Sequence, residues 1–230
     1  MLTLVLAESE VELIPASILT NPRVVSSAQR RGKPPRELLL ESSIHHGAMG
    51  SLPEFERRGR PDIMHLVLLV SLESILNKQH QLRLIVHTRN DEQITIDPST
   101  RIIKHYDRFL GLIEQLFVKQ VLPDEDNPLL ELTPHCSLEH ILDKLETDYK
   151  VACSSTGKPV NLPLFFSNLK KKHKHNITIV VGGFPHGDFH SDIKTMVDDV
   201  ISIYPEMVPA WTVVSELCVN YENLFVSKPL

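Results

Sequence analysis

The chain has 230 residues, of which 42% are hydrophobic, so it can bury the core of one large domain or of two small ones. Lys and Arg number 24 and Asp and Glu 29, a formal charge of −5, which excludes RNA binding through overall basic charge. No apolar run approaches the roughly 20 residues that span a bilayer, and Glu8 interrupts the first one too early for a signal peptide. The 3 cysteines are widely spaced, as in reduced thiols. We therefore expect a cytoplasmic protein with no membrane contact.

The first 60 residues contain one clear element. The apolar run from Leu2 to Ala7 predicts a buried strand. Between Asn21 and Arg36, three prolines and a glycine lie among basic residues, which predicts an irregular surface loop. A new element is expected to open at Leu38.

A helix is predicted to begin at Pro61, because proline fits the first helical turn, where its missing N–H is not needed. Asp62 follows in the place where a carboxylate complements the helix dipole. Apolar residues then recur at intervals of three and four, as on the buried face of a helix. Arg60 and Asp62 can form a charged pair beside this helix start. Alternatively, Asp62 is only a helix-start acid next to an exposed arginine.

The middle of the chain predicts a hairpin and two helices. The runs 82–88 and 93–96 flank a polar turn, which is the pattern of a β-hairpin. Helices are expected from Tyr106 to Val118 and from Leu138 to Leu145.

Three cations precede or open the first of these helices. Arg101, Lys104 and Arg108 stand at positions i, i+3 and i+7, so in a continuous helix they share one face. A row of cations suits the phosphates of an RNA backbone. The alternative is an ordinary solvated helix side.

The last 80 residues alternate between strand and helix patterns. Strands are predicted at 151–153, 177–181 and 200–204, and a helix at 211–223. This alternation indicates an α/β fold with a mainly parallel sheet. Glycines at 182, 183 and 187 follow the second of these strands; they either let a ligand approach the backbone or only make a turn. The apolar stripe of the helix, which includes Trp211 and Leu217, packs either on the chain's own sheet or on a second copy.

The 12 histidines invite a search for a metal site. No group of them has the spacing of a zinc site, with a CxxC pair or an HExxH motif. We therefore expect no metal ligands.

Taken together, ordered segments over nearly the whole chain resemble the NEP-type (essential-for-mitotic-growth) ribosome biogenesis methyltransferases of the SPOUT superfamily, and their archaeal branch in particular. The matching segments are Leu4 to Ile14, Arg58 to Ile63, Leu84 to Thr88, Arg101 to Gly111, Gly182 to Gly187, Ser202 to Tyr204 and Ala210 to Val213. An ordered set of this kind is much more specific than any of its motifs alone.

The resemblance implies one SPOUT domain over residues 1–230, a trefoil-knotted α/β fold with a β-hairpin insertion. It places the cofactor pocket and the knot in about 150–230. It further implies a homodimer that uses S-adenosylmethionine, without a metal, to methylate ring nitrogen 1 of a pseudouridine in small-subunit (16S) ribosomal RNA. A non-catalytic pre-ribosomal RNA-binding assembly factor is the alternative, and a related SPOUT enzyme with another RNA target is a third possibility.

The resemblance also implies roles for individual residues. Arg60 matches a substrate-contacting arginine and Asp62 the acid that holds it; these are the expected catalytic residues. Arg60, Arg101, Lys104 and Arg108 match RNA-binding positions. The cofactor-binding positions are Thr156, Gly182, Gly187, Ser202, Ile203, Tyr204, Pro205, Glu206 and Met207. Lys104 stands in place of the usual arginine and Ile103 in place of a frequent proline, which leaves the helix start after them open.

Overall fold

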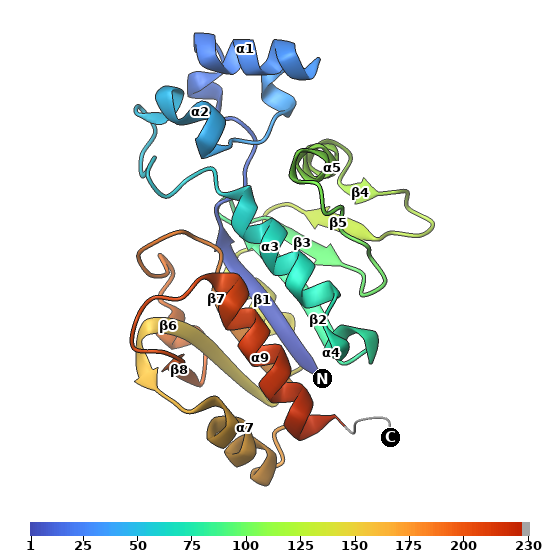
Figure 1. The fold of residues 1–230 in the computed structure, drawn as a ribbon, viewed down its shortest axis with the longest axis vertical. Helices are drawn as coiled ribbons and strands as arrows, with labels where there is room; N and C mark the ends of the chain where they lie inside the picture. The colour runs from blue at the N-terminus through green and yellow to red at the C-terminus, as the bar shows by residue number, and fades with distance from the viewer. Residues whose placement is uncertain (227–230) are drawn as a thin grey trace.

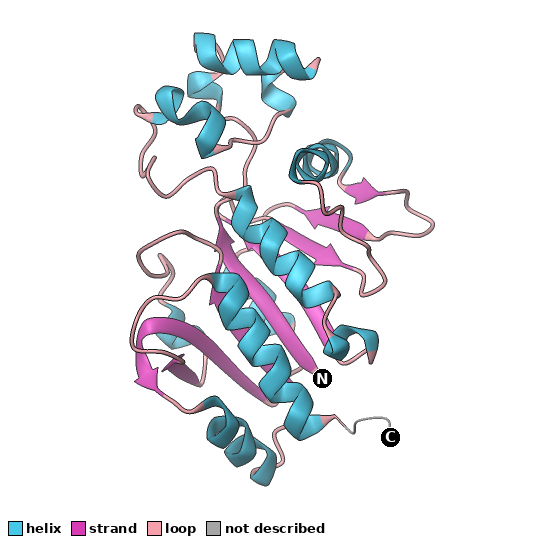
Figure 2. Ribbon diagram, viewed as in Figure 1, coloured by secondary structure: helices cyan, strands magenta, loops and turns pink. Residues whose placement is uncertain are grey.

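The computed structural model describes residues 1–226. They fold around a single eight-stranded sheet (Figures 1 and 2). The strand order is β4-β5-β3-β2-β1-β7-β6-β8. The strands are β1 (Leu2–Ser9), β2 (Leu82–Thr88), β3 (Gln93–Ile96), β4 (Val121–Leu122), β5 (Leu130–Thr133), β6 (Tyr149–Pro159), β7 (Ile177–Gly182) and β8 (Asp199–Ser202). Strands β2, β1, β7, β6 and β8 are parallel, and β3, β5 and β4 extend the sheet antiparallel. The predicted α/β class with a mainly parallel sheet is confirmed.

Helices cover both faces of the sheet. They are α1 (Pro22–Arg31), α2 (Ser42–Met49), α3 (Pro61–Leu72), α4 (Ile75–Lys78), α5 (Tyr106–Lys119), α6 (Leu138–Lys144), α7 (Leu162–Lys171), α8 (Ile193–Met196) and α9 (Ala210–Phe225). Leu4 and Leu6 of β1 face the main core with α3, α5, α7 and α9, whereas Val5 and Ala7 face a second core with α6 and α8. This alternation follows from the two-residue period of a strand. No helix within residues 1–226 has the length and apolar character needed to cross a membrane.

Most of the predicted elements are confirmed, among them β1, the β2–β3 hairpin, α3, α5, α6, β7 and α9. The strand predicted at 151–153 is longer and runs over Tyr149–Pro159, and the one predicted at 200–204 ends at Ser202. On α9, Leu217 and Cys218 are buried and Trp211 is half-buried against the chain's own core. The stripe therefore packs inside the molecule, so it gives no separate support for a dimer.

The prediction of an irregular surface loop from Asn21 to Arg36 is wrong, because residues Pro22–Arg31 form the helix α1. The Asn21 side chain accepts a hydrogen bond from the Arg23 N–H at 3.0 Å, and Pro22 occupies the first turn. Gly32, at φ 62°, ends the helix in the left-handed conformation. Residues that seemed to interrupt structure are thus the start and stop signals of a helix. A short 3-10 turn, Pro35–Glu37, follows it.

Helices α1 and α2 form a small lobe with its own core, above the sheet in Figure 1. Glu114 of α5 is completely buried and ties this lobe to the rest of the molecule. Its carboxylate accepts from Arg31 at 2.6 and 3.0 Å, from Lys33 at 2.7 Å and from the backbone N–H of Leu39 at 3.2 Å. Each oxygen of this buried charge is satisfied, as burial requires.

The lobe predicts a loss of stability in acid. Buried His45 accepts the N–H of Glu41 at Nδ1 and contacts Ser27 Oγ at 3.1 Å through Nε2, so the ring is neutral. Burial, followed by the charges of Arg31 and Arg30, lowers its pKa from 6.5 to about 4. Between these pH values the imidazole of His45 is protonated in the unfolded chain but stays neutral in the folded lobe. The unfolding free energy should therefore fall by on the order of 2–3 kcal/mol as pH drops through this range, and level off below it.

Urea unfolding at both ends of this range measures the effect, with His45→Gln as the control variant. The glutamine variant should be less stable at neutral pH but should lack the His45 part of the pH dependence. An identical pH dependence in both proteins would contradict the assignment.

Candidate active site

A cleft of about 300 Å³ lies at the carboxyl ends of β7 and β8, beside the middle of β6. Parallel strands commonly present ligand sites at this edge, where the loops that follow them meet. One wall is made by residues 153–155 in the middle of β6, and another by residues 181–182 at the end of β7 with 184–188 after it. The rest comes from residues 201–204 and 206–211 at and after the end of β8, from Val213 of α9, and from Arg60 and Ile63 at the start of α3. The cleft is therefore built from segments that are far apart in the sequence.

Most of the predicted cofactor-binding residues line this cleft. Those that do are Gly182, Gly187, Ser202, Ile203, Tyr204, Glu206 and Met207. Pro205 and Thr156 do not. The hydroxyl of Thr156 instead donates to Asp188 at 2.9 Å, and Ser154 donates to the same oxygen at 2.8 Å. Thr156 thus contacts a residue of the cleft wall, and Ser154 and Ser155 take the lining positions.

Asp188 is a wall residue whose carboxylate is fully engaged. Its second oxygen accepts the N–H of Phe189 at 2.9 Å. Partial burial raises the pKa of Asp188, but the hydrogen bonds from Phe189, Ser154 and Thr156 and the charge of Lys194 outweigh it, and the net shift is downward. An ionised aspartate with occupied oxygens is suited to holding the loop after β7 against strand β6. Gly187, just before it, turns at φ 84°, a conformation that favours glycine.

The Arg60–Asp62 pair is formed, in the first of its two predicted arrangements. Arg60 Nε and Nη2 donate to the two carboxylate oxygens of Asp62 at 2.8 and 2.7 Å. This bidentate geometry raises the pKa of Arg60 despite its partial burial. The Arg60 backbone N–H also donates to Glu10 O at 2.8 Å, so the residue is held at both ends. The arginine therefore stands in the wall of the cleft with its guanidinium fixed.

The prediction that Arg101, Lys104 and Arg108 form one row on a helix face is wrong. Helix α5 begins at Tyr106, and residues 101–105 precede it without helical structure. All three cations are exposed. Buried Ile102 and a contact between His65 Nε2 and Ile103 O at 2.9 Å hold the preceding segment against α3. Arg101 and Lys104 thus lie on the irregular segment 101–105, and Arg108 lies in the first turn of α5.

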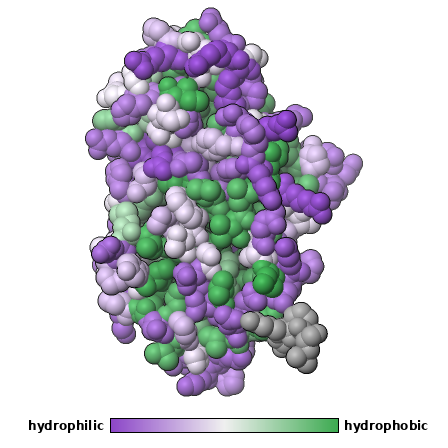
Figure 3. Space-filling model, viewed as in Figure 1, coloured by the Kyte–Doolittle hydropathy of each residue, from purple (hydrophilic) through white to green (hydrophobic). Residues whose placement is uncertain are grey.

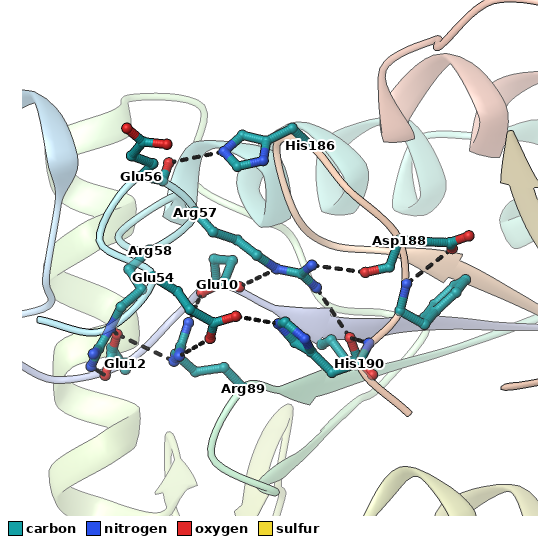
Figure 4. Close-up of polar contacts among 12 residues, drawn as sticks. Glu10, Glu12, Glu54, Glu56, Arg57, Arg58, Arg89, His186, Asp188 and His190 are labelled. Carbon is teal, nitrogen blue, oxygen red and sulfur yellow. Dashed lines mark hydrogen bonds and ion pairs between the residues drawn. The ribbon is translucent and has the colours of Figure 1, made fainter. Parts of the chain in front are cut away.

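Sequence reasoning missed a network of buried charges beside the cleft (Figure 4). Arg57 pairs with Glu8 and Glu10, Arg58 pairs with Glu12, and Arg89 reaches Glu10, Glu12 and Glu54. The available signal was the alternation Glu8, Glu10, Glu12 after a buried strand. Carboxylates in such a place need buried cations as partners.

The fold and the cleft define an α/β protein with a candidate ligand site at the carboxyl edge of a parallel sheet, beside a fixed arginine. No group of three or more His, Cys, Asp or Glu side chains within residues 1–226 is arranged to hold a metal ion.

The chain belongs to the EMG1/NEP1 methyltransferase family, whose model matches residues 4–222, so the predicted family is confirmed. It is 44% identical over 223 residues to the ribosomal RNA small subunit methyltransferase Nep1 of Methanothrix thermoacetophila, covering 97% of this chain and 96% of the relative. It is 45% identical over 221 residues to the same-named protein of Pyrococcus furiosus, covering 96% of each.

Among solved structures, the chain is similar to Archaeoglobus fulgidus Nep1 bound to S-adenosylhomocysteine. The TM-score is 0.84 at 32% identity, with 96% of this chain and 97% of that chain covered. The predicted fold type is confirmed by this similarity, while the trefoil knot stays a prediction.

Proposed function

We propose that this protein transfers a methyl group from S-adenosylmethionine to small-subunit ribosomal RNA in the cytoplasm. The observation that carries the proposal is the cleft itself, in which the ends of β7 and β8 and the middle of β6 meet a fixed Arg60. Its relatives are named as small-subunit ribosomal RNA methyltransferases, and a structural neighbour holds S-adenosylhomocysteine. Both facts support a methyl donor in this cleft.

The residues of the cleft fit such a cofactor. Ile201, Val208 and Ala210 offer apolar walls for a flat base, while the backbone at the strand ends offers polar groups. S-adenosylmethionine supplies a methyl group already activated by a positively charged sulfur. The protein's own contribution is then to orient the acceptor and to exclude water.

We propose ring nitrogen 1 of a pseudouridine as the acceptor. Loss of its N–H proton places negative charge on the ring, and the Arg60 guanidinium, held by Asp62, is positioned to stabilise that charge. The base must leave its stack to enter the cleft.

Labelled S-adenosylmethionine and two matched hairpins, one with uridine and one with pseudouridine, test the proposal. We expect label only on the pseudouridine hairpin. Label on uridine would favour a related enzyme with another target. Tight hairpin binding with no transfer to either RNA would favour the non-catalytic assembly factor.

We further propose that residues 1–230 form one SPOUT domain with its knot in about 150–230. The similarity to the solved Nep1 structure supports a single domain, because it covers 96% of this chain and 97% of that one.

The exposed cations should set RNA affinity. Arg101→Ala, Lys104→Ala and Arg108→Ala are each expected to weaken hairpin binding and to lower the salt slope by about one phosphate contact. S-adenosylhomocysteine affinity should not change. Fluorescence titrations over a range of salt concentrations measure both quantities. Lys119→Ala, an exposed cation at the other end of α5, is the control; an equal loss there would mean that only net charge matters.

We also propose a homodimer formed through α3, α4 and α9. Leu66, Ile75 and Val219 are exposed apolar residues on these three helices, which pack against one another. Figure 3 shows apolar surface gathered over α3 and α9 on this face. An apolar face of this kind suits a twofold contact.

Light scattering should give twice the 26.1 kDa of one chain at micromolar concentration. Val219→Lys should produce monomers, because it places a charge in the apolar contact. Val118→Lys, at an equally exposed position on α5, should leave the dimer intact. A monomeric wild-type protein would refute the dimer, and dissociation by both variants would refute this face.

A further inference from the structure

Arg57 is a buried arginine that reaches the wall of the cleft from outside it (Figure 4). Its Nε donates to Glu10 Oε1 at 2.7 Å, and its Nη2 donates to Glu8 Oε2 at 3.1 Å. The third nitrogen, Nη1, donates to the backbone oxygen of Asp188 at 2.8 Å. The guanidinium also lies 3.9 Å from the ring centre of Phe184, in cation–π contact. Each of the three guanidinium nitrogens therefore donates a hydrogen bond, and the plane of the group contacts an aromatic ring.

Two of these partners, Phe184 and Asp188, belong to the loop 183–191, which follows β7. Phe184 and Asp188 both line the cleft, whereas Arg57 does not. Arg57 therefore acts on the cleft only through these two wall residues.

Glu8 also binds the loop 183–191, at its carboxyl end. Its carboxylate accepts the backbone N–H of His190 at 2.8 Å and that of Ser191 at 2.9 Å, in addition to Arg57. Glu8 sits at φ 51°, an unusual conformation for a residue other than glycine, where the pairing of β1 shifts register. This backbone geometry is one that the surrounding contacts must hold in place.

The neighbouring arginine shows that these contacts are specific. Arg58 is nearly as buried as Arg57 and binds Glu12 through two hydrogen bonds of 2.7 Å. Its remaining contact is the backbone oxygen of Pro53, 3.4 Å away, on its own segment. Arg58 makes none of the hydrogen bonds or ring contacts that join Arg57 to the loop 183–191.

We infer that Arg57, with Glu8, is a positioning residue that holds the loop 183–191 in the shape that binds the cofactor. Arg57 and Arg60 lie on one short segment, so the same segment fixes the cofactor wall and the arginine at the substrate side. This inference rests on the proposed function, because it takes the methyl donor as the ligand of the cleft.

Arg57→Lys and Arg58→Lys form a matched pair of variants. Lysine keeps the positive charge that Glu8 and Glu10 need, but it lacks the planar fork and cannot reach all four partners. Both variants should lose similar thermal stability. Only Arg57→Lys should weaken S-adenosylhomocysteine binding in calorimetry, by about 10-fold or more. It should also raise KM for S-adenosylmethionine while kcat at saturation changes little, and speed hydrogen exchange at 183–191.

Equal S-adenosylhomocysteine affinity in the two lysine variants would overturn the inference. If Arg57→Lys does not fold, Glu8→Gln decides in its place, because it weakens the same grip without touching the cleft, and unchanged affinity there would overturn the inference. Wild-type protein that binds no S-adenosylhomocysteine would instead overturn the proposed function.

Discussion

Asp62→Asn is expected to lower the single-turnover rate of methyl transfer by about 100-fold while hairpin affinity changes little. The two carboxylate oxygens each accept from one nitrogen of the Arg60 fork, at 2.8 and 2.7 Å. In asparagine one of these oxygens is replaced by an NH2 group, which only donates and so cannot accept from the second nitrogen. Arg60 would then lose its fixed direction at the rim of the cleft. Charge that develops on the acceptor ring would be stabilised less well.

The competing explanation is that Asp62 only complements the dipole of α3, whose first turn it occupies. In that case the substitution costs about 0.3–1 kcal/mol of stability and little activity. Glu139→Gln is the matched control, because Glu139 is the acid in the first turn of α6. Thermal melts and single-turnover assays on both variants separate the two effects. Normal turnover in a mildly destabilised Asp62→Asn protein would remove the pair from the active site.

Gly182→Val is expected to abolish measurable S-adenosylhomocysteine binding, and Gly182→Ala to weaken it by about 10-fold or more. A Cβ atom at this position would lie 2.4 Å from Cζ of Phe184, so the ring must move. That ring lines the cleft and covers the Arg57 guanidinium. Its displacement therefore changes the cofactor wall as well as the space in the cleft.

Calorimetry measures this effect, with Gly111→Ala as the control. A Cβ at Gly111, on α5, meets no atom within 4 Å, so this variant should bind normally. It should also be slightly more stable, because alanine favours a helix over glycine. Undiminished binding by Gly182→Val would remove the β7 loop from the cofactor site.

Arg60 and most of the predicted cofactor residues line one cleft, while their roles stay predictions. Two predictions failed because they depended on a side-chain direction or a backbone conformation that spacing does not give. Thr156 turns to Asp188, 32 positions away, and the cations at 101–108 are not on one helix because α5 begins only at Tyr106. Spacing along the chain predicts a shared face only when the backbone conformation is known.

The sequence by itself determined the elements whose signals lie within a few residues. The β-branched run of β7, the hairpin at 82–96 and the proline start of α3 are of this kind, because strand and helix periods are local. The start and stop signals of α1, Asn21 and Gly32, are also local and present in the sequence, although the segment was interpreted as a loop.

Only the tertiary structure decided how the buried charges are paired. Arg57 and the Asp188 carbonyl are 131 positions apart, and Glu114 meets Arg31 across 83 positions. The run Glu8, Glu10, Glu12 indicates that buried carboxylates will pair with cations. The sequence does not show which of the several arginines pairs with which glutamate. The choice among them depends on the path of the whole chain, since an ion pair forms only where folding removes both partners from water together.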